Sequence, residues 1–98
     1  MMIYSQAELD TCIEEAIAKM AALNDPEPLD RACHTIQLQL EAFQGWLAEG
    51  NTAMSADDKE RYTMGLVAQR ELRSIDPPLS DLVVAVHNYL IEDIPIDG

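Results

Sequence analysis

The chain has 98 residues, of which 18 are acidic and 6 are basic, so its formal net charge at pH 7 is −12. This length suits one domain with one core, which we expect to span residues 1–98. The acidity disfavours direct binding to nucleic acid and to anionic membranes, because phosphate groups are bound through Lys and Arg. It favours a basic protein partner instead.

Proline and glycine signals divide the first half of the chain into two predicted helices. The first follows a capping box at residues 5–8 and ends at the Asn-Asp-Pro sequence at 24–26. The second begins around Pro28 and runs to about Glu49, with Gly50 placed as the residue past its C-terminus.

Two further helices are predicted in the second half, and they meet at a proline corner. The third is expected to run without interruption from Ser55 to about Ile75. Asp76 precedes two prolines, which end that helix and open a fourth from Pro77 to about Glu92. Short connections make neighbouring helices antiparallel. The expected fold is therefore all-α, a compact bundle of four principal antiparallel-packed helices.

Each predicted helix carries an apolar stripe at helical spacing. The residues expected to face the core are Leu9, Cys12, Ile13, Ala16, Ile17 and Met20; Leu29, Ala32, Cys33, Ile36, Leu40, Phe43 and Leu47; Met64, Val67, Ala68, Leu72 and Ile75; and Leu79, Leu82, Val83, Val86 and Leu90. Leu38 and Trp46 fall off the second stripe and are either a second buried face or partner-facing residues. Gly65 lies inside the third helix, where glycine costs about 1 kcal/mol relative to alanine. It therefore predicts the close approach of another helix.

The cysteines and histidines do not form a recognisable catalytic or metal-binding pattern. Cys33 and His34 are adjacent, so on a helix their side chains diverge by about 100° and cannot form a dyad. The Glu-x-x-His spacing of di-iron bundles is absent, and so is a glycine-rich phosphate loop. We expect no enzymatic activity, no cofactor and no metal. His34 and His87 are both expected at the surface or at its boundary.

The stretch from Thr63 to Leu82 carries a family resemblance. It follows the pattern T-M-G-x-x-A-x-[KR]-E-[LF] and then D-P-x-L-S-x-x-L, which resembles a family of small helical immunity proteins. Members of that family neutralise the NAD(P)-hydrolysing toxins that bacteria deliver through the type VI secretion system. The matching positions are Thr63, Gly65, Ala68, Arg70, Glu71, Leu72, Asp76, Pro77, Leu79, Ser80 and Leu82. The resemblance implies a protein that binds a cognate toxin domain, an NAD(P) glycohydrolase, and occludes its active site.

Two other functions compete with this one. A small acidic secretion chaperone or adaptor suits the composition equally well. An inhibitor that mimics nucleic acid would need carboxylates in an ordered row. The predicted third helix interrupts the acidic surface with four basic residues, Lys59, Arg61, Arg70 and Arg73.

The residues chosen as candidate partner contacts are Trp46, Asp57, Asp58, Glu60, Glu71 and Asp81. Trp is enriched at interface hot spots, although Trp46 fits a half-buried core position equally well. Acidic clusters are more often solvated helix ends than contacts. No secretory signal and no membrane-spanning segment is recognisable, so a cytoplasmic location is expected. The sequence leaves the oligomeric state open, and a homodimer is compatible with it.

Overall fold

Every regular element in the described part of the chain is a helix. The computed structural model describes residues 2–27 and 30–97. The elements are α1 (Gln6–Leu23), α2 (Arg31–Ala48), α3 (Ala56–Arg61), α4 (Met64–Val67), the π-helical segment η1 (Ala68–Leu72) and α5 (Pro77–Glu92). An isolated parallel bridge joins Met54 to Ile96.

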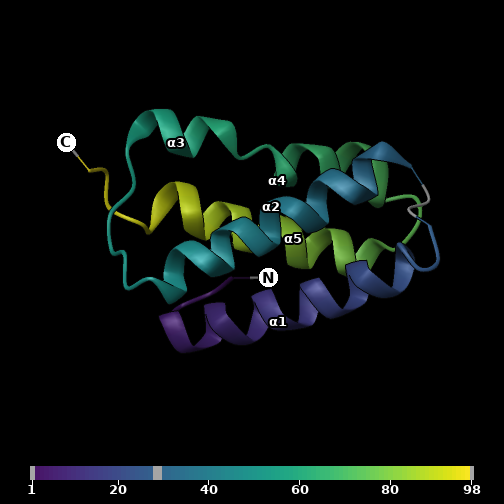
Figure 1. Cartoon of the computed structure of the whole chain (residues 1–98), viewed down its shortest axis with the longest axis horizontal. Coiled ribbons are helices and arrows are strands. Elements are labelled where there is room, and N and C mark those ends of the chain that lie inside the picture. The colour runs from purple at the N-terminus through teal and green to yellow at the C-terminus, as the bar shows by residue number, and fades with distance from the viewer. Residues whose placement is uncertain (1, 28–29, 98) are drawn as a thin grey trace.

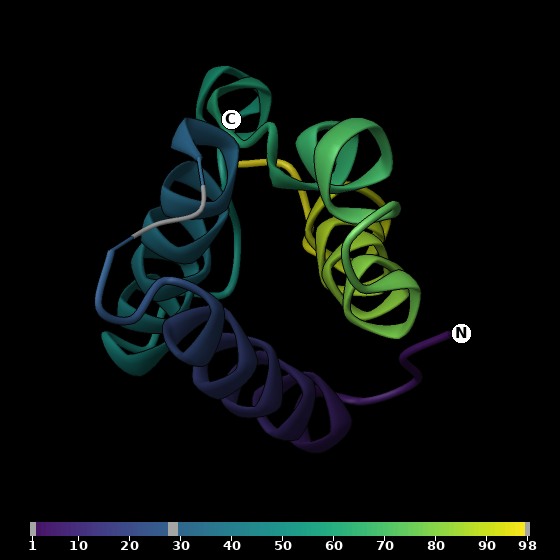
Figure 2. The ribbon, with the colours of Figure 1, turned by 90° about the vertical axis from the view of Figure 1, so that its right-hand side faces the viewer.

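Four helical segments form an up-down-up-down bundle: α1, α2, the continuous α4–η1 segment, and α5. Figure 1 shows that consecutive segments run in opposite directions, and the end-on view in Figure 2 places them around a common core. α1 packs against α2 and α5, and α4–η1 packs against the same two helices from the other side. The predicted all-α bundle of four principal antiparallel-packed helices is confirmed.

The helix ends follow the predicted capping chemistry. The Ser5 hydroxyl accepts the Glu8 amide at 3.2 Å, and Asp76 accepts the Leu79 amide at 3.1 Å. Gly50 has the positive φ of 86° that suits the residue past a helix C-terminus. The proposed start of the second helix at Pro28, and the core position Leu29, lie outside the described residues. α2 begins after the N-cap Asp30, which accepts the Cys33 amide at 2.9 Å.

The third helix is interrupted, and the prediction of one continuous helix from residue 55 to 75 is wrong. α3 ends at Arg61, and the helical path resumes only at Met64. The Gln39 side-chain oxygen accepts the amides of Thr63 and Met64, both at 2.8 Å, and its nitrogen donates to the Thr63 hydroxyl at 3.1 Å. A side chain of α2 thus caps a new helix start, so these amides need no carbonyl from the preceding turn.

A π-helical turn also displaces the end of this segment. The Arg73 amide donates to the Ala68 carbonyl at 3.0 Å, five residues back, and the buried Ser80 hydroxyl donates to the same oxygen at 3.0 Å. A π turn takes one residue more than an α turn and rotates the following residues around the axis. Ile75 is therefore 42% exposed, and its predicted place in the core is wrong.

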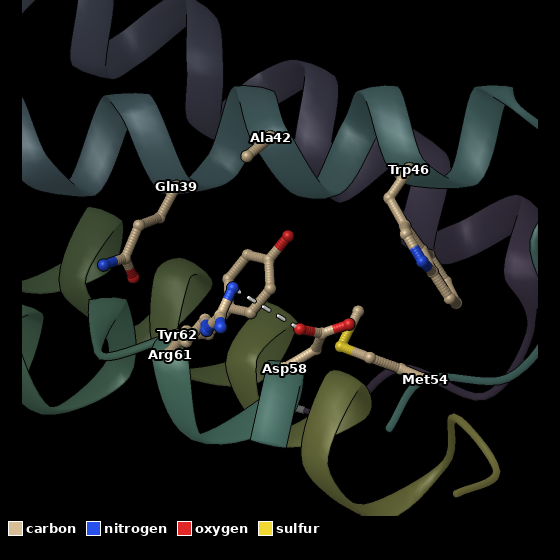
Figure 3. Close-up of a pocket in the computed structure, with 7 residues that line it drawn as sticks. All are labelled: Gln39, Ala42, Trp46, Met54, Asp58, Arg61 and Tyr62. Carbon is tan, nitrogen blue, oxygen red and sulfur yellow. Dashed lines mark ion pairs between the residues drawn. The ribbon is translucent and has the colours of Figure 1, made fainter. Parts of the chain in front are cut away.

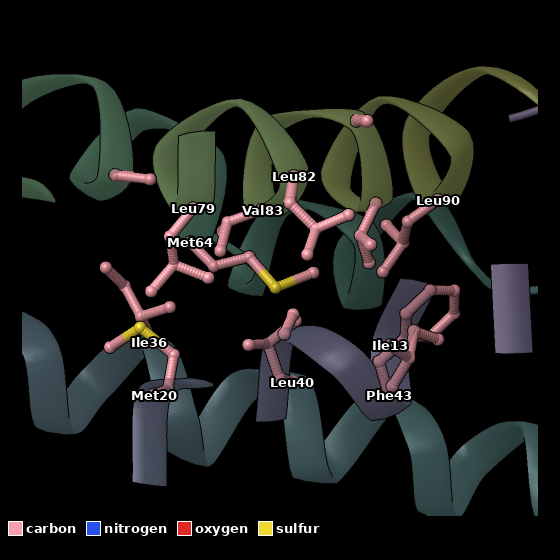
Figure 4. Packing of buried hydrophobic residues seen from close by; sticks show 14 of the residues in the cluster. Ile13, Met20, Ile36, Leu40, Phe43, Met64, Leu79, Leu82, Val83 and Leu90 are labelled. Atoms are coloured by element: carbon pink, nitrogen blue, oxygen red, sulfur yellow. The ribbon is translucent and has the colours of Figure 1, made fainter. Parts of the chain in front are cut away.

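The core fills the space between the four segments, as Figure 4 shows for ten labelled side chains from all of them. Buried residues are Leu9, Ile13, Ala16 and Met20 of α1; Cys33, Ile36, Leu40 and Phe43 of α2; Met64, Ala68 and Leu72 of α4–η1; and Leu79, Leu82, Val83, Val86 and Leu90 of α5. The stripe-edge residues Cys12, Ile17, Ala32, Leu47 and Val67 are partly buried. The predicted stripes thus identify most of the core. Ile3, Met54, Ala85 and Ile94 are also buried and lie outside those stripes.

Gly65 lies against His87, which confirms the predicted close approach of two helices. A Cβ atom on Gly65 would lie 2.7 Å from His87 Nδ1 and 2.9 Å from His87 Cβ. The Gly65 amide donates to His87 Nδ1 at 2.6 Å, so that nitrogen carries no proton and the other ring nitrogen does. His87 is only 9% exposed, which corrects its expected place at the surface or its boundary, whereas His34 is exposed as expected.

We expect Gly65→Ala to lower the free energy of unfolding by about 1–3 kcal/mol, because the new methyl group would overlap the His87 ring and its Cβ. Gly45 in α2 is the matched control, since a Cβ there meets nothing within 4 Å. Gly45→Ala should stabilise the protein by about 0.5–1 kcal/mol. Chemical denaturation of both variants measures the difference. Stabilisation by both substitutions would contradict the packing of Gly65 on His87.

Burial of His87 makes the stability depend on pH. Desolvation lowers the pKa of His87 from its ordinary value of 6.5, so the unfolded chain binds this proton more readily than the folded one. Stability should therefore be highest above pH 6.5 and fall as the pH drops from there toward the folded-state pKa. Denaturation between pH 7.5 and 5.5 measures this, with about 6.5 as the upper edge of the change.

The effect belongs to one side chain, so a variant can isolate it. His87→Asn should be less stable at pH 7.5 but should lose most of the pH dependence in this range. His34→Gln, at the exposed histidine, should keep it. An unchanged slope in His87→Asn would assign the pH dependence to other groups.

Candidate functional site

A groove separates α3 from the bundle. α3 does not pack on the four long segments as closely as they pack on one another, and Figure 3 shows the open space between it and α2. The cavity has a volume of about 300 Å³ and is lined by Gln39, Ala42 and Trp46 of α2, by Met54, and by Asp58, Arg61 and Tyr62 at α3. Residues 39, 42 and 46 share one helix face because they are three and four apart.

Two aromatic side chains pack against a buried third ring. Phe43 is fully buried, and its ring lies 6.0 Å from that of Trp46 in a stacked arrangement at 30°. It lies 6.0 Å from that of Tyr62 in an edge arrangement at 66°. Such pairs are favourable and fix the orientation of the rings. Trp46 and Tyr62 are only partly buried, so each still presents surface to the groove.

A carboxylate is directed into the same groove. In Figure 3, Asp58 lies between Tyr62 and Trp46. Its closest cation is Arg61, whose Nη1 lies 3.7 Å from Asp58 Oδ1, with the two side chains 81% and 56% exposed in that order. Exposed pairs of this kind contribute at most about 1 kcal/mol. Burial, together with the charge of Asp58, raises the pKa of Tyr62, so its hydroxyl stays protonated at neutral pH.

The position of α3 depends on a buried lysine and on the C-terminal tail. Lys59 is 6% exposed, and its ammonium donates to the carbonyl oxygens of Ile91, at 3.0 Å, and of Ile94. The Ile91 carbonyl lies in the last turn of α5 and the Ile94 carbonyl just beyond it, at the helix end where a cation is favoured by the helix dipole. Met54 exchanges backbone hydrogen bonds of 2.9 Å with Pro95 and Asp97. Lys59 is therefore a structural residue, and its expected place on the surface is wrong.

The predicted contact residues fall into two groups. Trp46 and Asp58 line the groove, and Asp57 and Glu60 are exposed on the same short helix as Asp58. Glu71 and Asp81 are also exposed but belong to η1 and to the start of α5. Figure 1 places these elements at the end of the bundle away from α3. The structure thus does not gather all six residues into one surface.

The sequence interpretation missed Tyr62, Met54 and Gln39 as groove residues. Tyr62 falls within the predicted third helix but outside its apolar stripe. It lies in the groove because α3 stops at Arg61, and that stop depends on Gln39 from another helix. The available signal was weak: an aromatic residue that follows a strongly acidic turn without joining the apolar stripe.

The residues of the Thr63–Leu82 pattern mostly serve the architecture. Leu72, Leu79 and Leu82 are buried, and the Gly65, Ala68, Asp76 and Ser80 positions make the close contact, the π turn and the cap described above. Arg70 and Glu71 differ from these. Both are exposed, and neither makes a side-chain hydrogen bond or ion pair to another described residue.

The adjacent Cys33 and His34 do not face each other. Burial raises the pKa of the Cys33 thiol, and Cys33 is buried while the adjacent His34 is exposed, so the two side chains point apart as expected. Within residues 2–27 and 30–97, no group of three His, Cys, Asp or Glu side chains is placed to hold a metal ion. In the same ranges no helix has the length and apolar character needed to cross a membrane.

Comparison of the chain with protein-family models, with curated proteins and with solved structures gives no match.

We expect Lys59→Met to release α3 from the end of α5, because methionine keeps the apolar stem but donates no hydrogen bonds. The free energy of unfolding should fall by about 1.5–3 kcal/mol. Amide hydrogen exchange of α3 should accelerate more than that of α1, and the emission of Trp46 should change. Lys19→Met is the control, since Lys19 makes an exposed pair with Glu15 at 3.0 Å and should matter little. Equal effects of the two substitutions would contradict the anchoring role of Lys59.

Proposed function

We propose that this protein is an immunity protein: a cytoplasmic, non-catalytic partner that binds a cognate antibacterial toxin domain and occludes its active site. The toxin class proposed is an NAD(P)-degrading enzyme delivered by type VI secretion. The observation that carries this proposal is the sequence pattern from Thr63 to Leu82.

The architecture is consistent with that pattern marking a scaffold. Its apolar and small residues build the α4–η1–α5 hairpin, so the spacing of the pattern follows from packing. Arg70 and Glu71 are the charged positions of the pattern that packing and hydrogen bonds leave unexplained. We therefore propose Glu71 as a contact residue and add Arg70 beside it.

Charge complementarity supports a toxin that binds a dinucleotide. A cleft that accepts pyrophosphate presents positive charge or amide donors to its ligand. An acidic surface competes for that cleft, and Asp57, Asp58 and Glu60 supply one on α3. Because these side chains are exposed, they should act on the rate of association, while Trp46 in the groove should act on dissociation.

A secretion chaperone or adaptor is the alternative, and the groove gives it one specific argument. Apolar walls around an open channel also suit an extended segment of an unfolded partner. The two functions differ in what is bound. An immunity protein binds the folded toxin domain and abolishes its activity, whereas a chaperone binds an unfolded segment and leaves the folded domain active.

The test is co-expression with the toxin domain encoded beside this protein, with growth and cellular NAD as readouts. The toxin alone should deplete NAD and stop growth, and co-expression should restore both. Death with depleted NAD despite abundant folded protein, or a complex in which the toxin stays fully active, would refute the immunity function.

Reversing Asp57 and Glu60 to Lys should slow association by about tenfold at low salt, since steering of this kind depends on exposed charge. Reversing Asp10 and Glu14, exposed on α1, is the matched control and should have a smaller effect. Equal effects would show that only net charge matters. Intact protection with no effect of either pair would leave the function standing and remove α3 from the interface.

A further inference from the structure

We infer that the groove between α2 and α3 is a receptor for a basic side chain of the partner, arginine above all, and that Arg61 occupies its carboxylate until the partner arrives. The site is inferred from the residues that line the groove, and only the identity of the partner as a toxin domain rests on the proposed function.

The lining matches the two parts of an arginine side chain. Trp46 and Tyr62 present aromatic surface, and a guanidinium is attracted to such a face within about 6 Å of the ring centre. Asp58 lies between these rings in Figure 3 and can accept two parallel hydrogen bonds from the planar head. Ala42 is exposed and gives the aliphatic stem an apolar surface.

The other two classes of side chain fit the groove less well. An apolar side chain would bury Asp58 with no partner beyond the 3.7 Å contact to Arg61, which costs the desolvation of a charge. An acidic side chain would meet Asp58 together with the neighbouring carboxylates of Asp57 and Glu60 on α3. A cation is the ligand that satisfies both the aromatic walls and the carboxylate. The chain's net charge of −12 adds a long-range attraction for it.

The groove is organised before any ligand binds. Phe43 packs against both aromatic side chains, at ring distances of 6.0 Å, and so orients them. The Asp58 backbone amide donates to the Ser55 hydroxyl at 3.1 Å, so the residue is held at the start of α3. Lys59 ties α3 to the end of α5. A ligand therefore meets walls that need little further ordering, which favours binding.

Arg61 acts as an internal competitor that is easily displaced. Its Nη1 atom stays 3.7 Å from Asp58 Oδ1, longer than a hydrogen bond, and its side chain is 81% exposed. The pair is three residues apart on α3, so it forms without any cost in chain closure. A partner arginine that also contacts the rings gains more from Asp58 than Arg61 does. Removal of Arg61 should therefore strengthen binding, whereas removal of the Asp58 charge should weaken it.

Trp46 is the chain's one tryptophan, so its fluorescence reports directly on the groove. The probes are three end-blocked tripeptides, leucine–arginine–leucine, leucine–citrulline–leucine and leucine–glutamate–leucine, titrated into the purified protein to about 10 mM. Citrulline has the shape of arginine without its charge. We expect a saturable change in Trp46 emission with the arginine peptide, and at least about fivefold weaker binding of the other two.

Two variants of opposite expected sign make the test specific. Asp58→Asn should weaken the arginine peptide by about fivefold or more, and Arg61→Gln should tighten it by about two- to fivefold. Asp57→Asn, the neighbouring carboxylate on α3, is the matched control and should change the affinity by less than about twofold. All of these positions are exposed, so circular dichroism should confirm an unchanged fold.

Three results would overturn the inference: no saturable change with the arginine peptide, equal binding of the citrulline peptide, or weaker binding to Arg61→Gln. None of these measurements involves a toxin. Protection in cells with no peptide binding would remove this site and leave the immunity function. Peptide binding without protection would do the reverse.

Discussion

The fold depends on one helix start that is capped from outside. Three successive amides, those of Thr63, Met64 and Gly65, donate to side chains of other helices: the first two to Gln39 of α2 and the third to His87 of α5. The Gly65 contact is buried and the Met64 contact partly buried, and buried amides without a partner are costly. This cluster therefore fixes α2, α4 and α5 relative to one another at a single point. It also explains why Gly65 has no side chain, since the His87 ring occupies that space.

The same interruption creates the groove. A third helix that continued without a break from residue 55 would place its acidic first turns in line with the bundle, and α3 would not be displaced from it. Because the chain turns at 62–63 instead, α3 lies beside α2 at a distance that leaves about 300 Å³ open. The ammonium of Lys59 and the tail at Pro95 then hold this displaced helix in place. A structural break within the bundle and a candidate binding surface outside it therefore share one cause.

The parts of the fold that depend on neighbours in sequence were predictable. Ser5 and Asp76 are N-caps, and Gly50 follows a helix C-terminus; local chemistry specifies all three roles. The apolar stripes follow from helical periodicity. The features that were missed depend on partners far along the chain. Gln39 caps a helix 24 residues away, and the Lys59 ammonium bonds the Ile91 carbonyl 32 residues away. A glutamine or a lysine in a sequence does not by itself indicate such a role, which is why the third helix was expected to be continuous and Lys59 to be exposed.

For the candidate site, Trp46 and Asp58 could be selected by residue type alone, whereas Tyr62 and Met54 required the displaced position of α3.

The distribution of charge links the architecture to binding. Within the described residues, Lys59 holds a helix end, Lys19 pairs with Glu15, and Arg61 pairs weakly with Asp58. Three of the six basic residues are thus engaged in contacts within the chain, while its 18 acidic residues outnumber the basic ones threefold. An excess of one sign destabilises a compact protein through self-repulsion. A basic partner relieves that repulsion wherever it docks, so net charge alone would attract it to any face.

The groove differs from the rest of this acidic surface because it combines a carboxylate with two oriented aromatic side chains. Charge can therefore determine how fast a basic partner arrives, and the groove can determine where it stays.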